Sequence, residues 1–178
     1  NVSNVVSLGG ALTVGGTFNN DNAAILSLNG SNFTVTGAFT NGDTAGNTTA
    51  TVRLTGAETV TLTSGADIDS GTFEYVGNGT GSALLTTIKD FGATDYYALI
   101  INDASVSNSD VFQVGAALDI AANLTITDGE FVAGAFTTTI GGNFTRGASG
   151  VFTPSTSTVV FNSAANDHAI SGSTTFYN

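Results

Sequence analysis

A short repeat with a period of about 20–21 residues runs through this chain and limits the folds open to it. The segment LTVGGTFNN begins at Leu12 and recurs as FTVTGAFTN from Phe33. Two further copies are LDIAANLTI from Leu118 and TTIGGNFTR from Thr138. This period is too short for a four-stranded propeller blade, and the copies are too rich in strand-forming residues for a helical repeat. It matches one coil of a parallel β-solenoid, whose coils lay short strands on those of the coil before.

Apolar and polar residues alternate inside each copy, which places the apolar residues on one face of a strand. Val14, Val35, Ile120 and Ile140 occupy the same position in the four copies, so we expect them to be buried and stacked coil on coil. The same alternation predicts seven further inward residues: Leu12, Phe18, Phe33, Phe39, Leu118, Leu124 and Phe144. Glycines near the ends of the copies suit the corners between strands, where a positive φ is often required.

A longer repeat of about 106 residues relates the two halves of the chain, with 8–63 resembling 114–170. Leu12 corresponds to Leu118 and Phe33 to Thr138, and the two offsets agree to within one position, which is not expected of chance matches. The section near 83–110 breaks the rhythm. We therefore expect 1–178 to form a single repetitive β-solenoid segment with an irregular section between its halves.

An antiparallel β-sandwich, or a stack of them, is the alternative fold. Short strands separated by Gly and Asn turns every 8–12 residues also predict that architecture. Asn29-Gly30, Asn41-Gly42 and Asn78-Gly79 are dipeptides that favour tight hairpin turns. Both alternatives are all-β, and the repeat period favours the solenoid.

Composition and charge restrict the partners and the cellular location. Hydrophobic residues make up 41% of the chain, enough to form a core, whereas only 10% of residues are charged. The net charge of −11 argues against nucleic acid and anionic lipid, which bind clustered Lys and Arg. No apolar run approaches the roughly 18 residues that span a bilayer, so we expect no membrane insertion. An acidic surface without cysteine, rich in Ser, Thr and Asn, favours an extracellular or cell-surface location.

Coils of the TVGG type are followed by TVVFN at 158–162 and by ISGSTTFYN at 170–178. This string resembles repeats in very large bacterial and archaeal cell-surface proteins of the β-helical adhesin and filamentous-haemagglutinin type. The resemblance covers most of 8–41 and 114–178. It implies secretion, a long stalk or fibre, and adhesion or shielding rather than catalysis, and it transfers no active-site residues.

Two pairs of acidic residues are the candidate metal ligands. Asp67 and Asp69, and likewise Asp128 and Glu130, are two residues apart, so each pair faces one way if it lies on a strand. Carboxylate oxygens are ligands that Ca²⁺ prefers, and paired carboxylates also hydrolyse glycosidic bonds. A calcium-binding β-roll needs several consecutive motifs, and SGADIDSG occurs once. We expect no cofactor, with Ca²⁺ at these four residues as the alternative.

The remaining reactive groups favour structural roles, and we expect no catalytic residues. His168 follows Asp167, but no nucleophile elbow accompanies them, so a surface turn is the expected place of this histidine. Lys89 beside Asp90 would form an isopeptide bond only with a buried Asn and a catalytic carboxylate in contact. Seven Asn-x-Ser/Thr sequons suit either glycosylation or turns: Asn1, Asn29, Asn32, Asn47, Asn78, Asn123 and Asn143.

These observations predict a structural or adhesive module of an extracellular filament, stalk or adhesin that assembles by end-to-end β stacking. The terminal segments NVSNVVSLGG and GSTTFYN carry neither charge nor Pro, the usual devices that blunt a strand edge. We expect Val5, Val6, Phe176 and Tyr177 to contact another copy or adjacent repeats of the same polypeptide. Surface glycans are further candidate partners. The alternative functions are a carbohydrate-active β-helix enzyme, either a glycosidase or a lyase, and a carbohydrate-binding module.

Overall fold

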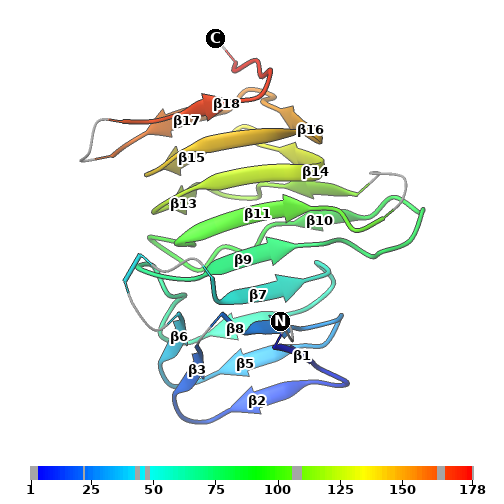
Figure 1. Cartoon of the computed structure of the whole chain (residues 1–178), viewed down its shortest axis with the longest axis vertical. Helices are drawn as coiled ribbons and strands as arrows, with labels where there is room; N and C mark the ends of the chain where they lie inside the picture. The colour runs from blue at the N-terminus through cyan, green and yellow to red at the C-terminus, as the bar shows by residue number, and fades with distance from the viewer. Residues whose placement is uncertain are drawn as a thin grey trace.

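The chain forms a stack of β coils along one axis (Figure 1). The computed structural model describes residues 4–21, 23–42, 45–46, 49–105, 110–163 and 167–177. All strand pairings within these ranges are parallel, which confirms the β-solenoid, since a sandwich of hairpins requires antiparallel pairs. The same ranges contain no helix long and apolar enough to cross a membrane.

The largest sheet among the described residues has ten strands and runs the length of the stack. Eight of them follow one another along the axis: β1 (Val5–Ser7), β4 (Ile25–Ser27), β7 (Thr51–Leu54), β9 (Thr72–Tyr75), β11 (Ala98–Asn102), β14 (Leu124–Val132), β16 (Phe144–Thr153) and β18 (Ile170–Ser171). The second halves of β14 and β16 form part of a second side, or wall, of the solenoid. On this wall β12 (Val111–Gln113) pairs with β14, and β10 (Leu85–Thr87) pairs with β12.

Three smaller sheets complete the coils in the part of the chain that the structure describes. They are formed by β2 (Leu12–Val14), β5 (Phe33–Val35) and β8 (Val60–Leu62), by β13 (Leu118–Ile120), β15 (Thr137–Ile140) and β17 (Thr158–Phe161), and by β3 (Phe18–Asn20) and β6 (Phe39–Asn41). β3 and β6 lie at the left of Figure 1, whereas β10 lies at the right. The N-terminal and C-terminal coils therefore differ in the wall that closes them.

The register of the strands agrees with the short repeat. Val14 lies opposite Val35, and Ile120 lies opposite Ile140, so equivalent positions of successive copies pair with each other. Other coils are longer, such as the one that leads from Leu26 to its partner Val52. More residues lie between the strands of these coils, and the sequence repeat does not include them.

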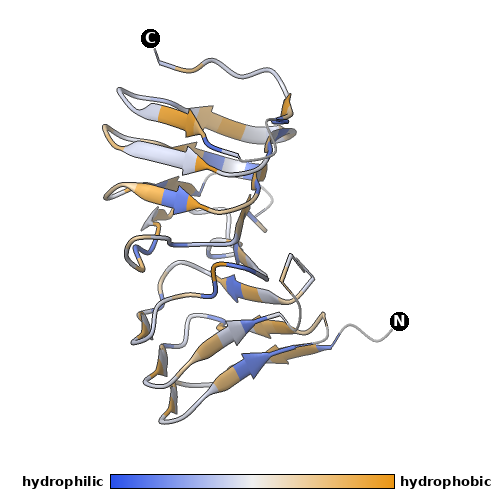
Figure 2. Ribbon diagram, turned by 90° about the vertical axis from the view of Figure 1, so that its left-hand side faces the viewer, coloured by the Kyte–Doolittle hydropathy of each residue, from blue (hydrophilic) through white to orange (hydrophobic). Residues whose placement is uncertain are grey.

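One column of inward side chains runs through the whole stack: Val6, Leu26, Val52, Phe73, Leu99, Leu124, Phe144 and Ile170. The six inner members are buried, but Val6 is 59% exposed and Ile170 is 51% exposed because each has a neighbouring coil on one side only. Val14 is half-buried for the same reason, while Val35, Ile120 and Ile140 are buried as expected. Figure 2 shows hydrophobic and hydrophilic residues alternating along the strands.

Two buried tyrosines hold the irregular section between the halves. The Tyr75 hydroxyl accepts a hydrogen bond from the Lys89 N–H (3.0 Å), and the Tyr96 hydroxyl donates to the Lys89 carbonyl (2.6 Å). The two hydroxyl oxygens are 3.0 Å apart. Since the Tyr96 proton is directed to Lys89, Tyr75 donates to Tyr96. These hydroxyls satisfy the backbone polar groups of Lys89, which lies outside the strands.

Candidate functional site

The N-terminal face of the stack is the outer edge of β1, β2 and β3. Their backbone hydrogen bonds to described residues run to the second coil, as from Leu12 N–H to the Asn32 carbonyl (2.9 Å) and from Phe18 N–H to the Ala38 carbonyl (2.9 Å). Val5 and Val6 are exposed, at 43% and 59%. Among the residues that the structure describes, the face therefore presents an unpaired strand edge together with the open ends of apolar columns.

Phe18 and Asn20 begin two side-chain columns at this N-terminal face. The Phe18 ring stacks on Phe39 with centroids 6.1 Å apart and planes within 5° of parallel. The Asn20 amide nitrogen donates to the Asn41 side-chain oxygen (2.8 Å) and to the Thr51 carbonyl (3.1 Å). Asn41 repeats this orientation one coil further on, where its nitrogen donates to the Thr72 carbonyl (3.0 Å).

The orientation of Asn41 fixes the polarity of this asparagine ladder. Its side-chain oxygen faces the N-terminal side and accepts from Asn20, while its nitrogen faces the C-terminal side. The Asn20 nitrogen also faces the C-terminal side, which leaves its Oδ1 on the opposite side of a side chain that is only 6% exposed. No donor to this oxygen is found among the described residues. The ladder thus ends in an open hydrogen-bond acceptor.

The C-terminal face is more closed than the N-terminal one. Arg146 lies opposite Ile126, at the end of a second buried column that contains Ile101. It donates to the carbonyls of Gly150 (2.6 Å) and Ser173 (2.8 Å). Phe176 packs across the end of the core, with its centroid 5.5 Å from that of Phe152. The structure therefore places Phe176 against the core of its own chain.

The four expected end residues differ in their surroundings. Val5, Val6 and Tyr177 are exposed, with Tyr177 at 56%, whereas Phe176 is half-buried. The expected role of these residues in assembly stays a prediction. The sequence analysis did not single out Phe18 and Asn20 as end residues, although the repeated Phe-x-Asn of LTVGGTFNN and FTVTGAFTN marks their position.

Asp67 acts as a hydrogen-bond acceptor at a corner. Its carboxylate accepts from the backbone N–H groups of Asn41 (2.8 Å), Asp69 (3.1 Å) and Ser70 (3.2 Å), and from the Ser70 hydroxyl (3.0 Å). Asp69 is exposed, and the hydrogen bond and charge of Asp67 raise the pKa of its carboxyl. The two carboxyl groups therefore lie close together, but the donors around Asp67 already occupy its oxygens.

Asp128 and Glu130 lie in β14 and are engaged separately. An Asp128 oxygen accepts from the Gly129 N–H (2.8 Å), and a Glu130 oxygen accepts from the Thr153 hydroxyl (2.5 Å). Within the part of the chain that the structure describes, no group of three or more His, Cys, Asp or Glu side chains could hold a metal ion. The Ca²⁺ alternative therefore rests on each acidic pair alone.

Four buried acids that the sequence analysis did not single out perform the same task as Asp67. Glu58 accepts from Gly30 N–H (2.9 Å) and Gly56 N–H (2.8 Å), which links two coils. Asp95 accepts from Phe91 and Asp119 N–H groups (2.7 and 2.9 Å), and burial raises the pKa of its carboxyl. The other two, Asp103 and Asp110, receive N–H donors in the same way. Such acids satisfy backbone groups at corners, where strand ladders end.

His168 lies beside a shallow hollow near the C-terminal face. Its ring nitrogen Nδ1 is 2.6 Å from the Gly142 carbonyl, and its ring packs on Phe161 with centroids 5.3 Å apart. The hollow is lined by Asn143, Asp167, His168 and Ala169. Among the described residues, this lining contains no Ser, Thr or Cys that would complete a nucleophilic triad, and the histidine holds a corner of the coil.

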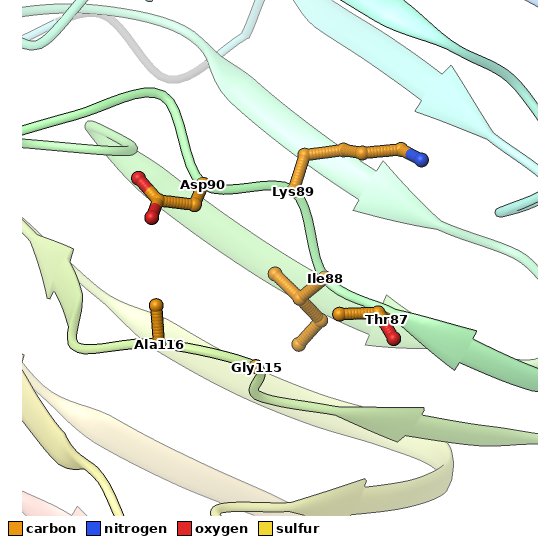
Figure 3. A pocket seen from close by; sticks show the side chains of 6 residues that line it. All are labelled: Thr87, Ile88, Lys89, Asp90, Gly115 and Ala116. Atoms are coloured by element: carbon orange, nitrogen blue, oxygen red, sulfur yellow. The ribbon is translucent and has the colours of Figure 1, made fainter.

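Lys89 and Asp90 line another hollow, of about 330 Å³, at the irregular section. Figure 3 shows the Lys89 and Asp90 side chains pointing in different directions. The other lining residues are Thr87, Ile88, Gly115 and Ala116, so neither an Asn nor a second carboxylate borders this hollow within the described ranges. The arrangement offers no partner for an isopeptide bond among these residues.

Three of the sequons place their asparagines at corners between coils. The side-chain oxygens of Asn32, Asn123 and Asn143 accept from the N–H groups of Thr59, Asn143 and Ala169, each at 2.8 Å. Asn29 and Asn78 lie in turns. Asn1 and Asn47 lie outside the described residues. The described sequons thus have structural roles whether or not they carry glycans.

The comparisons with known proteins add no relative. No protein-family model, curated protein or solved structure matches this chain. The fold and the geometry of the two faces are therefore the basis for a function.

Proposed function

We propose that this chain is a structural or adhesive module of an extracellular surface filament, stalk or adhesin, and that it assembles by end-to-end β stacking. The observation that carries the proposal is the inward column from Val6 to Ile170, which is buried in between and open at both ends. A further coil at either end would bury apolar side chains and pair free backbone groups. The partners are copies of the chain or adjacent repeats of the same polypeptide.

The hydrogen-bond partners of the buried acids and of His168 support a structural role rather than a catalytic one. Buried acids bind backbone N–H groups, as Glu58 and Asp95 do, and the ring nitrogen of His168 contacts a carbonyl. These groups hold the coils in place. The acidic, cysteine-free composition supports the extracellular location in this proposal.

Sedimentation velocity of the purified chain over a range of micromolar concentrations tests the proposal. End-to-end stacking predicts a series of species whose average size grows with concentration. A single monomeric species at every concentration would overturn assembly by this chain alone. Screening the same sample on a glycan array separates stacking from the carbohydrate-binding alternative, which predicts retention on a defined set of sugars.

A further inference from the structure

We infer that His168 and Asp167 form a binding site for a divalent transition-metal cation such as Zn²⁺, in the hollow that both residues line. The proposed function neither requires such a site nor depends on it. Three features lead to the site: the proton position on the imidazole ring, the fixed surroundings of that ring, and a carboxylate in the same hollow.

The contact between His168 and Gly142 fixes the position of the ring proton. Nδ1 lies 2.6 Å from the Gly142 carbonyl oxygen, which can only accept a hydrogen bond, so Nδ1 carries a hydrogen and donates it. In the neutral ring Nε2 then has a free lone pair, and no hydrogen bond to it is found among the described residues. Histidines that bind metals are held in the same way, with one ring N–H on a carbonyl and the other nitrogen on the ion.

The surroundings of His168 set the direction of its ring. The next residue, Ala169, donates its N–H to the Asn143 side-chain oxygen (2.8 Å) and accepts from the Phe144 N–H (3.0 Å). The imidazole packs on the Phe161 ring, with centroids 5.3 Å apart. Because these contacts already order the ring, less conformational freedom is lost when an ion binds.

The hollow beside the ring offers a negative charge and room for a hydrated ion. Its volume is about 400 Å³, and its lining consists of Asn143, Asp167, His168 and Ala169. Asp167 is exposed, and no residue of this lining is a Lys or Arg. The whole chain carries 14 acidic and three basic residues, which favours the approach of cations.

The two ligand types select the kind of ion. An imidazole nitrogen suits Zn²⁺, Cu²⁺ and Ni²⁺, whereas Ca²⁺ and Mg²⁺ prefer oxygen ligands alone. Zn²⁺ takes four ligands, so water would fill the positions that His168 and Asp167 leave open. The site therefore differs in chemistry and in place from the Ca²⁺ alternative at the two acidic pairs.

NMR of the parent chain tests the site directly, because His168 is the only histidine in the sequence. Without metal, in mildly alkaline buffer, the ¹⁵N signals of the ring should show the proton on Nδ1. Zinc chloride should shift the Nε2 signal and saturate at one ion per chain, whereas calcium chloride at the same concentration should leave it in place. A proton on Nε2, or zinc binding that leaves both ring signals unchanged, would overturn the site.

Calorimetric titration with zinc chloride compares three variants with the parent chain. His168→Gln should weaken binding by at least about tenfold, the loss caused even by removing an outer partner of a metal ligand. Asp167→Asn keeps the shape but removes the charge, and it should weaken binding by at least about threefold, the size of one exposed charge contact. Asp69→Asn makes the same change at an exposed acid outside the hollow and should leave the affinity unchanged.

Each contrary result has a distinct meaning. Equal affinities of the parent chain and Asp167→Asn would show that the carboxylate takes no part, which would overturn the shared site. A loss in Asp69→Asn as large as that in Asp167→Asn would indicate unspecific attraction to acidic residues and would also overturn it. Since Asp167 is exposed, this comparison holds even where His168→Gln weakens the fold. Sedimentation of the metal-free chain tests end-to-end stacking separately.

Discussion

At the residue scale, Val35 gives the simplest test of which residues face inward in the sheet of β2, β5 and β8. It is buried between Val14 and Leu62, so Val35→Asp would bury a charge without a partner. We expect a loss of about 3–5 kcal/mol in the free energy of unfolding, measured by urea denaturation. The control Thr34→Asp faces outward on the same strand and should change the stability by less than about 0.5 kcal/mol. Equal effects of the two variants would show that the strand faces are assigned wrongly.

Asp67 and Asp69 give a second matched comparison. Asp67→Ala leaves the N–H groups of Asn41 and Ser70 without their acceptor, so we expect a loss of about 1–3 kcal/mol in the free energy of unfolding. Asp69→Ala removes an exposed side chain and should cost less than about 0.5 kcal/mol. Calcium should change neither value. A calcium-dependent rise in stability that both variants abolish would establish the metal site instead.

Val35 and the two acids show which properties of a single residue can be predicted from the sequence. Alternation along a strand identifies Val35 as inward because successive side chains point to opposite faces. Spacing alone cannot distinguish an acid that binds a metal from one that accepts N–H groups, because the donors around Asp67 come partly from the preceding coil. The roles of Glu58 and Asp95 could not be predicted either, because some of their N–H donors also come from neighbouring coils.

At the element scale, the tyrosine pair of the irregular section predicts a response to alkaline pH. Burial raises the pKa of Tyr75 to about 12 from its usual 10.0. Burial also raises the pKa of Tyr96 well above its usual value. Above pH 10 the unfolded chain releases phenol protons that the folded chain keeps. The free energy of unfolding should therefore fall as the pH rises from 10 through 12.

Denaturant unfolding across this pH range measures the effect. The Tyr75→Phe variant keeps only one of the two buried phenols, so its stability should fall less steeply with pH than that of the parent chain. It should also be less stable at neutral pH by about 1–3 kcal/mol, because the Lys89 N–H loses its acceptor. Parallel pH profiles for the two proteins would contradict the role of the buried hydroxyls.

The sequence repeat predicts which strands stack on each other, but it does not predict on which side of the solenoid each coil forms its further strands. The short period predicted that β2 stacks on β5 and β13 on β15, because equal steps along the chain bring equivalent residues into register. The longer coils and the change of wall depend on loops whose length carries no periodic signal. The longer repeat that relates the two halves stays a prediction.

At the scale of the whole molecule, the assembly should depend little on salt. The contacts expected between copies are backbone hydrogen bonds and apolar side chains such as Val5 and Val6, and neither is screened by ions. Sedimentation in low and in near-molar sodium chloride should therefore give similar size distributions. A collapse to monomer in high salt would indicate that charged groups hold the copies together.

Electron microscopy of the purified chain at micromolar concentration tests the central claim most directly. End-to-end stacking of parallel coils predicts unbranched filaments one solenoid in width, whose length increases with concentration. Isolated compact particles at every concentration, or lateral sheets without a common axis, would contradict the account.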